Sequence, residues 1–369
     1  MSKTVVVKVG SSTLTDGTPH LSKPIMLEIV RQIAMLNREG YQMLLVSSGA
    51  IAAGRDHLKH PRMPSSLPIK QMLSAVGQSQ LMHLYSQMFE MYAVLVGQVL
   101  VTDDDMRRNR ARYLNTRDTL ETLLDYKIVP IINENDTVTV ETIKVGNNDN
   151  LSALVASLIN ADILIMLTDR DGLYDSDPRT NPDARRIETV TQIDDSIRAR
   201  ASGISSSGLG VGGMVTKIQA AELAGRSGIE TFVAHGKEPD VIVRILRGES
   251  LGTRFLPSAP RVESRKRWLL SEPARGILRV DEGAAKALRR GNVSLLPVGI
   301  KAVQGKFERG ALVVVHDLME KPLAHGQVNY NSDELAQLCG IQSNDIESVL
   351  GYTYGDAAIH HDNMALIKG

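Results

Sequence analysis

Short, continuous apolar runs alternate with helical patterns along the first two thirds of this 369-residue chain, and this alternation limits the fold more than any other feature. A strand that is apolar at every position is buried on both faces, and strands joined through helices are typically parallel. We therefore predict an α/β fold with a mostly parallel open sheet sandwiched between helices. The predicted strands are residues 5–7, 43–46, 94–101, 128–132, 163–167 and 231–234, and the clearest predicted helices are 22–36, 68–91, 115–126 and 147–158.

Five of the predicted strands end in polar or glycine-rich clusters, at residues 8–12, 47–50, 102–103, 133–136 and 168–169. Any one cluster has a simple structural explanation, because strands end in turns and turns are polar. In open parallel sheets, however, ligands bind outside the carboxyl ends of the strands. Five clusters at that edge, together with two lysines and a glycine-rich loop, favour a ligand site there.

The glycine-rich loop is residues 208–217, GLGVGGMVTK, and it leads into a predicted helix with small residues on one face. Its four glycines allow positive φ and a close approach of the backbone to a ligand. Backbone N–H groups at a helix N-terminus bind anions, and Lys217 adds a full charge in the first turn. The order of Thr216 and Lys217 and the glycine spacing exclude a Walker A loop. A surface loop in front of a helix is the alternative explanation.

Two lysines, several glycine turns and few candidate general bases indicate phosphoryl transfer. That reaction depends on positioning and charge neutralisation more than on acid–base catalysis. Lys8 and Lys217 would flank the transferred phosphoryl group, and Asp149, at a helix start, would hold both ammonium groups in place. Asp149 would also serve as a helix N-cap, and the two roles are compatible.

The composition argues against several other classes of protein. Lys+Arg and Asp+Glu are both 42, so no excess charge indicates nucleic acid or an anionic membrane as a partner. The single cysteine, Cys339, excludes an intramolecular disulfide and fits a reducing compartment. We see no signal-peptide layout and no apolar run of transmembrane length, and we therefore expect a cytoplasmic protein. The histidines show no metal-ligand spacing, so no metal-binding residue is assigned, and the basic run 107–112 is given no chemistry.

Six motifs, in order between residues 5 and 257, resemble those of the amino acid kinase family. They resemble most closely the bacterial members that phosphorylate glutamate. The segment 276–368 resembles a PUA domain, and a stretch rich in proline, serine and arginine at 257–267 precedes it. We predict an amino acid kinase domain at 1–257, a linker at 258–275 and a PUA domain at 276–369. The motifs are KVGSS (8–12), SSGAIAAG (47–54), PIINENDTV (130–138), VGNNDNLSA (145–153), LTDRDGLYDSDPR (167–179) and GLGVGGMVTK.

The resemblance implies transfer of the γ-phosphoryl group of ATP to the side-chain carboxylate of L-glutamate, the first step of proline biosynthesis. A carboxylate is ionised at pH 7, so the reaction needs no general base. ATP and Mg²⁺ are the implied cofactors, with Mg²⁺ on the phosphates. The resemblance also implies a homo-oligomer, feedback inhibition by L-proline, and transfer of the product to glutamyl phosphate reductase.

The family's roles carry over to matching positions of this sequence. Lys8 and Lys217 would stabilise the phosphates, and Asp149 would organise the lysines. The implied nucleotide-binding residues are Lys8, Thr168, Asp169, Val211, Gly212, Gly213, Met214, Val215, Thr216 and Lys217. The implied glutamate-binding residues are Ser48, Gly49, Asn133, Asp136 and Asn148, with Asp136 as partner of the substrate ammonium.

One position departs from the family pattern. Asn147 stands where members commonly have aspartate. The lost charge weakens the affinity for glutamate or Mg²⁺, or is neutral if the side chain only accepts a hydrogen bond. We do not extend this difference to a change of substrate.

Two alternatives compete with a glutamate kinase. The first is a kinase of the same fold acting on another acid, such as N-acetylglutamate or aspartate, and the NENDTV motif and the PUA-like segment argue against it. The second is an RNA-binding protein acting through the PUA-like segment. From residue 258 onward the chain has 14 Lys+Arg and 13 Asp+Glu and no basic stripe with aromatic residues, so a structural or regulatory module is favoured. We expect this module to be β-rich, with a strand at 311–315 and a helix at 282–290.

Overall fold

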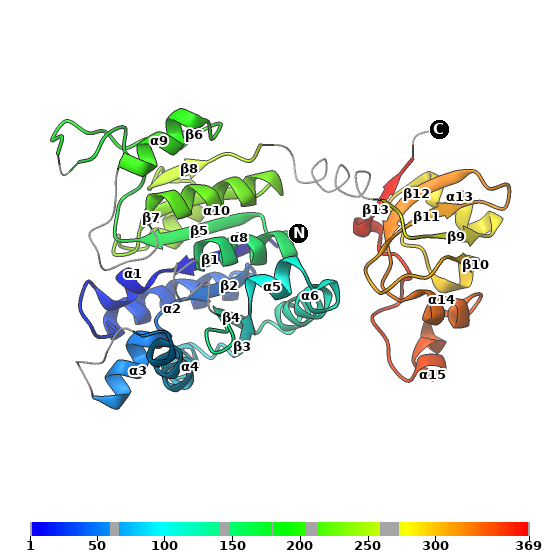
Figure 1. Ribbon diagram of the computed structural model, residues 1–369, viewed down its shortest axis with the longest axis horizontal. Helices are drawn as coiled ribbons and strands as arrows, with labels where there is room; N and C mark the ends of the chain where they lie inside the picture. The colour runs from blue at the N-terminus through cyan, green and yellow to red at the C-terminus, as the bar shows by residue number, and fades with distance from the viewer. Residues whose placement is uncertain are drawn as a thin grey trace. The chain divides into compact units, whose positions relative to one another are not determined.

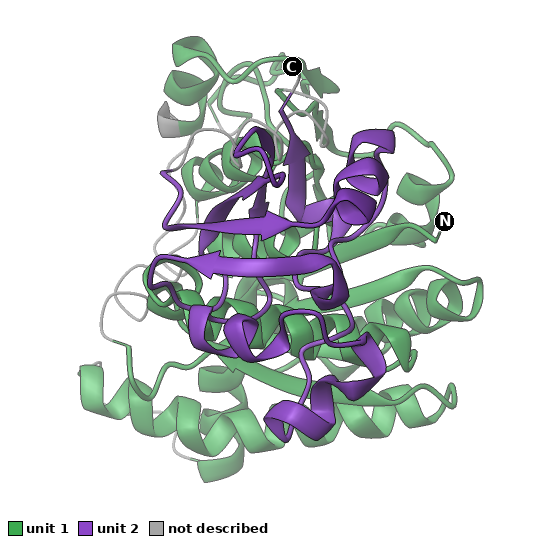
Figure 2. Cartoon of the chain, turned by 90° about the vertical axis from the view of Figure 1, so that its right-hand side faces the viewer, with its two compact units in different colours: residues 1–261 green, residues 262–369 purple. Residues whose placement is uncertain are grey.

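The computed structural model describes residues 2–59, 66–139, 148–178, 180–203, 213–258 and 273–367. The chain divides into two compact units, Met1–Arg261 and Val262–Gly369, which are described separately (Figure 2). The first contains an eight-stranded sheet and the second a five-stranded sheet. Within the described residues, no helix combines the length and the apolar character needed to cross a bilayer.

The sheet of the first unit is mostly parallel, as predicted, with the strand order β3-β4-β2-β1-β5-β7-β8-β6 (Figure 1). Among its described strands, only the pair β7–β8 is antiparallel. All six predicted strands are present, whereas β6 and β8 were not predicted because they are two and three residues long. The strands are β1 Thr4–Val9, β2 Gln42–Ser47, β3 Val96–Val101, β4 Val129–Glu134, β5 Ile163–Thr168, β6 Thr189–Val190, β7 Glu230–His235 and β8 Thr253–Phe255.

Helices bury both faces of this sheet, and the alternation of side chains along β1 shows it. Val5 and Val7 belong to one hydrophobic core and Val6 to the other, and all three are fully buried. The first core contains residues of α1 Ser11–Thr15, α2 Lys23–Arg38, α3 Ala50–Leu58, α4 Leu67–Glu90 and α11 Val241–Leu246. The second contains residues of α5 Asp103–Arg107, α6 Arg110–Asp125, α8 Asn148–Leu158, α9 Asp195–Gly203 and α10 Met214–Arg226.

Two helix starts refine the sequence prediction. Helix α6 begins at Arg110 rather than near 115, because the Asn109 side chain caps it by accepting from the Arg112 N–H at 3.0 Å. Ser22 occupies the N-cap position of α2, as predicted, but its side chain makes no capping hydrogen bond. The proline in the first turn of α2 supplies the favourable backbone geometry there.

Helices α3 and α4 cross in direct backbone contact. A Cβ atom on Gly77 would lie 1.8 Å from the carbonyl oxygen of Ala50, and one on Gly54 would lie 2.0 Å from that of Leu73. No side chain fits at either position, so the two glycines set the distance between the helices. Because α3 starts directly after β2, this contact also places α4 beside the carboxyl end of that strand.

The second unit is β-rich, as predicted, with the strand order β10-β9-β11-β12-β13. Its core includes Val315, Tyr330 and Leu335, which are fully buried. The predicted strand and helix appear as β11 and α13, and the Asp281 side chain caps α13 by accepting from the Ala284 N–H at 2.8 Å. The elements are β9 Gly276–Val280, α13 Glu282–Arg290, β10 Ile300–Gln304, β11 Leu312–His316, β12 Pro322–Gln327, α14 Ser332–Leu338, α15 Ile346–Leu350 and β13 Met364–Leu366.

Candidate active site

A buried aspartate lies between two buried lysines at the carboxyl edge of the first sheet. Asp149 Oδ1 is 2.5 Å from Lys8 Nζ, and Asp149 Oδ2 is 3.2 Å from Lys217 Nζ. The two lysines are 5% exposed and the aspartate 1%. We call these three residues the charged trio. Their predicted proximity is therefore present, with two cations sharing one anion.

Three different elements bring the charged trio together. Lys8 lies on the central strand β1, where it pairs with Val46 of β2 on one side and Met166 of β5 on the other. Asp149 is in the first turn of α8 and Lys217 in the first turn of α10. A Cβ atom on Gly10 would lie 3.2 Å from Lys8 Nζ, so the glycine after β1 leaves room for the ammonium group.

Thr216 is a fourth member of this cluster. Its hydroxyl lies 2.7 Å from Asp149 Oδ2 and 2.9 Å from the carbonyl oxygen of Gly213, the N-cap residue of α10. The hydroxyl thus ties the glycine-rich entry of α10 to the carboxylate in α8. This contact fits the predicted role of the loop at the phosphates, although residues 208–212 of the loop lie outside the described residues.

Opposing electrostatic effects act on the charged trio. Burial alone would raise the pKa of Asp149, but the adjacent Lys8 and Lys217 ammonium groups outweigh it and hold that pKa well below its usual range. For Lys8, burial lowers the pKa and exceeds the opposing effect of the Asp149 carboxylate. Asp149 is consequently fixed as an anion, which keeps it a counterion and excludes it as a proton acceptor at neutral pH.

The predicted acceptor side of the site is built mostly from neutral groups. The Asn148 carboxamide donates to Ser48 Oγ at 2.9 Å and to Asn133 Oδ1 at 3.0 Å. Asn133 in turn donates from Nδ2 to Gln78 Oε1 at 2.8 Å. The resulting amide chain links the ends of β2 and β4 with the start of α8 and the middle of α4. Since Asn148 precedes Asp149, it joins the charged trio directly along the chain.

Asp136 follows β4 and is the charged member of the acceptor side. Its Oδ2 accepts a hydrogen bond from Ser74 Oγ on α4 at 2.6 Å. Burial raises the pKa of Asp136, and the hydrogen bond from Ser74 opposes that rise. Gly49 adopts φ +106°, a conformation that favours glycine, where the chain turns from β2 into α3. This turn presents Ser48 to the amide chain.

The predicted nucleotide side follows β5 and opens α10. Thr168 Oγ1 donates to Asp169 Oδ1 at 3.0 Å, and the Thr168 carbonyl accepts from the Gly236 N–H at 2.8 Å. In α10, Met214 is buried in the core, whereas Val215 is 39% exposed. Of the predicted site residues, Val211 and Gly212 lie outside the described residues, as does Asn147.

Two residues at the site were missed by the sequence analysis. Ser74 and Gln78 lie on α4, which the sequence predicted as a helix without chemistry. Their spacing of four residues on an otherwise apolar helix face is the signal that would have identified them. The sequence does not show which strand ends they face, because that depends on how α4 packs.

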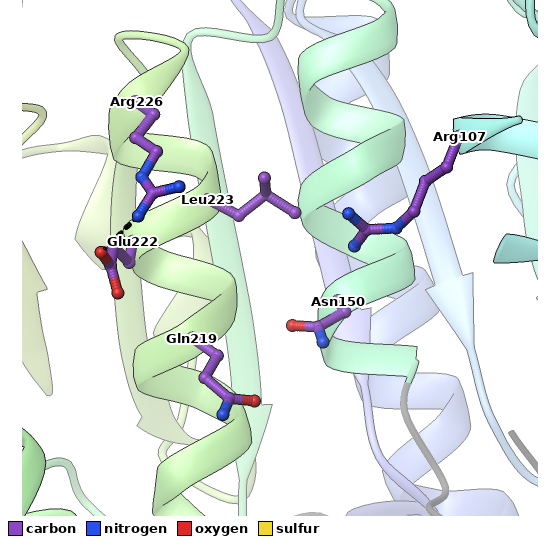
Figure 3. A pocket seen from close by; sticks show the side chains of 6 residues that line it. All are labelled: Arg107, Asn150, Gln219, Glu222, Leu223 and Arg226. Carbon is purple, nitrogen blue, oxygen red and sulfur yellow. Dashed lines mark hydrogen bonds and ion pairs between the residues drawn. The ribbon is translucent and has the colours of Figure 1, made fainter. Parts of the chain in front are cut away.

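A groove of about 210 Å³ is lined by residues of α5, α8 and α10, and none of these lining residues belongs to the charged trio (Figure 3). Its Gln219 is about 200° around α10 from Lys217. Within it, Arg226 bonds Glu222 at 2.7 Å. Arg107, from the basic run, also lines the groove. It includes none of the predicted site residues, and we assign it no part in the chemistry. Its lining residues are Arg107, Asn150, Gln219, Glu222, Leu223 and Arg226.

In the second unit, His360, His361 and Asp362 gather with their ligand atoms within 4.8 Å of one another. The sequence analysis assigned no metal-binding residue here. The rings stack with centroids 4.2 Å apart, and the aspartate beside them is exposed. Three adjacent residues on a surface turn do not form an enclosed site, and they carry none of the groups that phosphoryl transfer requires.

Comparison with known proteins assigns both units. Residues 3–235 match the amino acid kinase family, and residues 276–350 match the PUA domain. A protein of Haemophilus influenzae strain PittEE named glutamate 5-kinase is 51% identical over 367 residues, 99% of each chain. A glutamate 5-kinase of Pasteurella multocida is 50% identical over 100% of both chains, and one of Cronobacter sakazakii is 50% identical over 98% of both.

Proposed function

The chain belongs to the amino acid kinase family, and from this we propose that it transfers the γ-phosphoryl group of ATP to the side-chain carboxylate of L-glutamate. The observation that carries the proposal is the charged trio, which places two buried cations around one anion beside a chain of neutral amides. Glutamate as the acceptor is supported by relatives named glutamate 5-kinase, which are about 50% identical along the whole chain.

Lys8 and Lys217 stabilise the negative charge that redistributes over the phosphoryl oxygens during transfer. Preorganised cations in a site with little water are the main source of rate enhancement in such reactions. Asp149 keeps the two ammonium groups in place before the substrates arrive, so little reorganisation is needed. No residue has to remove a proton, because the acceptor is already a carboxylate.

The acceptor side orients glutamate. Asp136 pairs with the substrate ammonium, and Ser48 and Asn148 hold the substrate through hydrogen bonds. Gly49 and Asn133 support them, the glycine through its turn and the asparagine through its bond to Asn148. Thr168, Asp169 and the start of α10 bind the nucleotide. Catalysis is thus confined to a kinase domain at 1–257, followed by a linker at 258–275 and a PUA domain at 276–369.

Mg²⁺ fits this site as a companion of ATP. Each aspartate placed in the site already contacts a protein group: Asp149 contacts the two lysines, Asp136 contacts Ser74 and Asp169 contacts Thr168. Mg²⁺ commonly uses few protein carboxylates and several phosphate oxygens, so such a site suits an ion held mainly by the nucleotide. When bound, it would neutralise phosphate charge.

The reaction is tested by its product. Purified protein with ATP and Mg²⁺ is supplied with glutamate, aspartate or N-acetylglutamate, and ADP release is measured in each case. We expect release with glutamate and, in the presence of hydroxylamine, a hydroxamate, because an acyl phosphate is trapped by this nucleophile. ADP release with another acid only, or a phosphorylated product stable to hydroxylamine, would overturn the assignment.

We further propose that the protein forms homo-oligomers, as the family resemblance implies. Large apolar side chains are exposed around the amino end of edge strand β3: Met91 at 69%, Leu95 at 70% and Tyr126 at 77%. The Leu95 carbonyl accepts from the Val129 N–H at 2.9 Å, so this patch lies at the opposite end of the strands from the active site. Light scattering measures the molecular mass of the wild type and of Leu95→Glu, which places a charge in this patch. A monomeric wild type would contradict the proposal. Inhibition by L-proline and product transfer to a reductase stay predictions.

A further inference from the structure

Helix α4 carries a row of buried polar side chains in an otherwise apolar interface. Ser74, Gln78 and Tyr85 are 3%, 8% and 0% exposed. Their spacings of four and seven residues place them on one face of the helix. Buried polar groups destabilise a protein unless they are hydrogen-bonded, and apolar residues would pack there at lower cost. This row therefore indicates a role beyond packing.

Each member of the row contacts a residue at, or next to, the acceptor side of the site. Ser74 Oγ donates to Asp136 Oδ2 at 2.6 Å, and Gln78 Oε1 accepts from Asn133 Nδ2 at 2.8 Å. The Tyr85 hydroxyl is 2.8 Å from Ser47 Oγ, in the residue before Ser48. One helix is thus bonded to the carboxyl ends of β2 and β4 and to the loop that follows β4.

The charged trio has no comparable connection to this helix. No hydrogen bond or ion pair in the described part of the chain joins α4 to Lys8, Asp149 or Lys217 directly. Among the described residues, the hydrogen bonds that link α4 toward the charged trio pass through Asn148, from Gln78 by way of Asn133 and from Tyr85 by way of Ser47. A change on the buried face of α4 should consequently affect the amino-acid acceptor first.

From these contacts, and resting on the proposed function, we propose that Ser74 and Gln78 are positioning residues for the amino-acid substrate. Ser74 fixes the Asp136 carboxylate that receives the substrate ammonium, and Gln78 fixes the Asn133 amide so that Asn148 is held in place. Neither residue has to touch the substrate. The backbone contact at Gly54 and Gly77 keeps α4 in the register that this role requires.

A purely structural role would not produce the pH signature expected of Ser74. Its hydrogen bond opposes the rise that burial causes in the pKa of Asp136. Within the described residues, Ser74 is the side chain that bonds to that carboxylate, and burial and this bond are the two causes that shift the pKa of Asp136. Losing the hydroxyl should therefore raise the pKa of Asp136 further. Binding that needs the carboxylate would then fail at a higher pH as the solution is acidified.

The experiment compares Ser74→Ala and Gln78→Met with matched controls on the exposed face of the same helix, Ser79→Ala and Gln87→Met. We expect the KM for glutamate to rise by about 5–150-fold in the first two variants, because a buried partner is left unpaired. The kcat and the KM for ATP should stay within about twofold of wild type, as expected when only binding of one substrate is lost. Both controls should behave like wild type.

The second readout is the pH at which kcat/KM for glutamate falls as the solution is acidified, which we call the acid limb. The acid limb should move to higher pH in Ser74→Ala. It should lie at the wild-type pH in Ser74→Thr, which keeps the hydroxyl, and in Gln78→Met. Equal changes in the constants for both substrates, or an acid limb that does not move in Ser74→Ala, would overturn the proposal. If Ser74→Ala does not fold, the proposal is judged from the KM for glutamate, the KM for ATP and kcat of Ser74→Thr and Gln78→Met. A wild type without glutamate-dependent turnover refutes the proposed function instead, which separates the two failures.

Discussion

The two sides of the active site are built from different chemistry. The phosphate side consists of three formal charges, each no more than 5% exposed, in contact with one another. The acceptor side consists of amides and hydroxyls, with Asp136 as its one assigned charge. In the proposed reaction, charge is therefore concentrated where charge moves, and mostly neutral groups lie where the substrate only has to be held. The difference predicts that the two sides fail in different ways.

The largest effect is expected from Asp149→Asn, which removes the anion between two buried ammonium groups. Breaking a buried ion pair by removing one partner costs on the order of 3–5 kcal/mol of unfolding free energy. Urea unfolding measures the loss, with Asp195→Asn as control because its side chain is fully exposed in an ion pair with Arg198. Unchanged stability of Asp149→Asn would mean that the phosphate side is not held by charge.

Lys217→Ala should separate the two sides kinetically. If its ammonium group acts on the transition state as proposed, kcat should fall by about 10²–10³-fold, while the KM for glutamate changes little. Steady-state kinetics of the folded variant measure both constants. Lys286→Ala, an exposed lysine of the second unit, is the control. A preserved kcat would remove Lys217 from the catalytic residues.

Asp136→Asn should give the opposite pattern. Loss of a charged partner for the substrate ammonium should raise the KM for glutamate by about 10–150-fold and leave that for ATP unchanged. In the wild type, affinity should fall with falling pH as Asp136 takes up a proton, and this should begin above the usual pH because burial raises the pKa. The variant should lack this limb. If ATP saturation worsens instead, Asp136 belongs to the other side of the site.

The smallest effect is expected from ending the chain at residue 257. Every residue assigned to chemistry precedes that point, so glutamate-dependent ADP formation should stay near wild type. A cooperative thermal melt that ATP and glutamate shift upward establishes folding first. A truncated protein that binds both substrates but does not turn over would show that the second unit supplies catalytic groups. The active site would then contain a third part besides the phosphate side and the acceptor side.

The sequence sufficed for the features that depend on local patterns. Continuous apolar runs identified the six long strands, the polar clusters after them pointed to Lys8 and Asn133, and the predicted helix start pointed to Asp149. It did not suffice for features that depend on packing. Strand β6 has two residues, which is too short to show a sequence pattern. Gln78 contacts Asn133 only when α4 is packed on the sheet, and the sequence does not show that packing.

The glycine contact between α3 and α4 has a consequence for efforts to change which amino acid is accepted. A mutant library aimed at new acceptors would naturally vary the loops after β2 and β4. Gly54 and Gly77 should be kept constant in it, because any Cβ there would meet a backbone carbonyl at about 2 Å. Even alanine at these two positions would push the helices apart, and the loops would then be selected on a shifted scaffold. The exposed face of α4, by contrast, is free for randomisation.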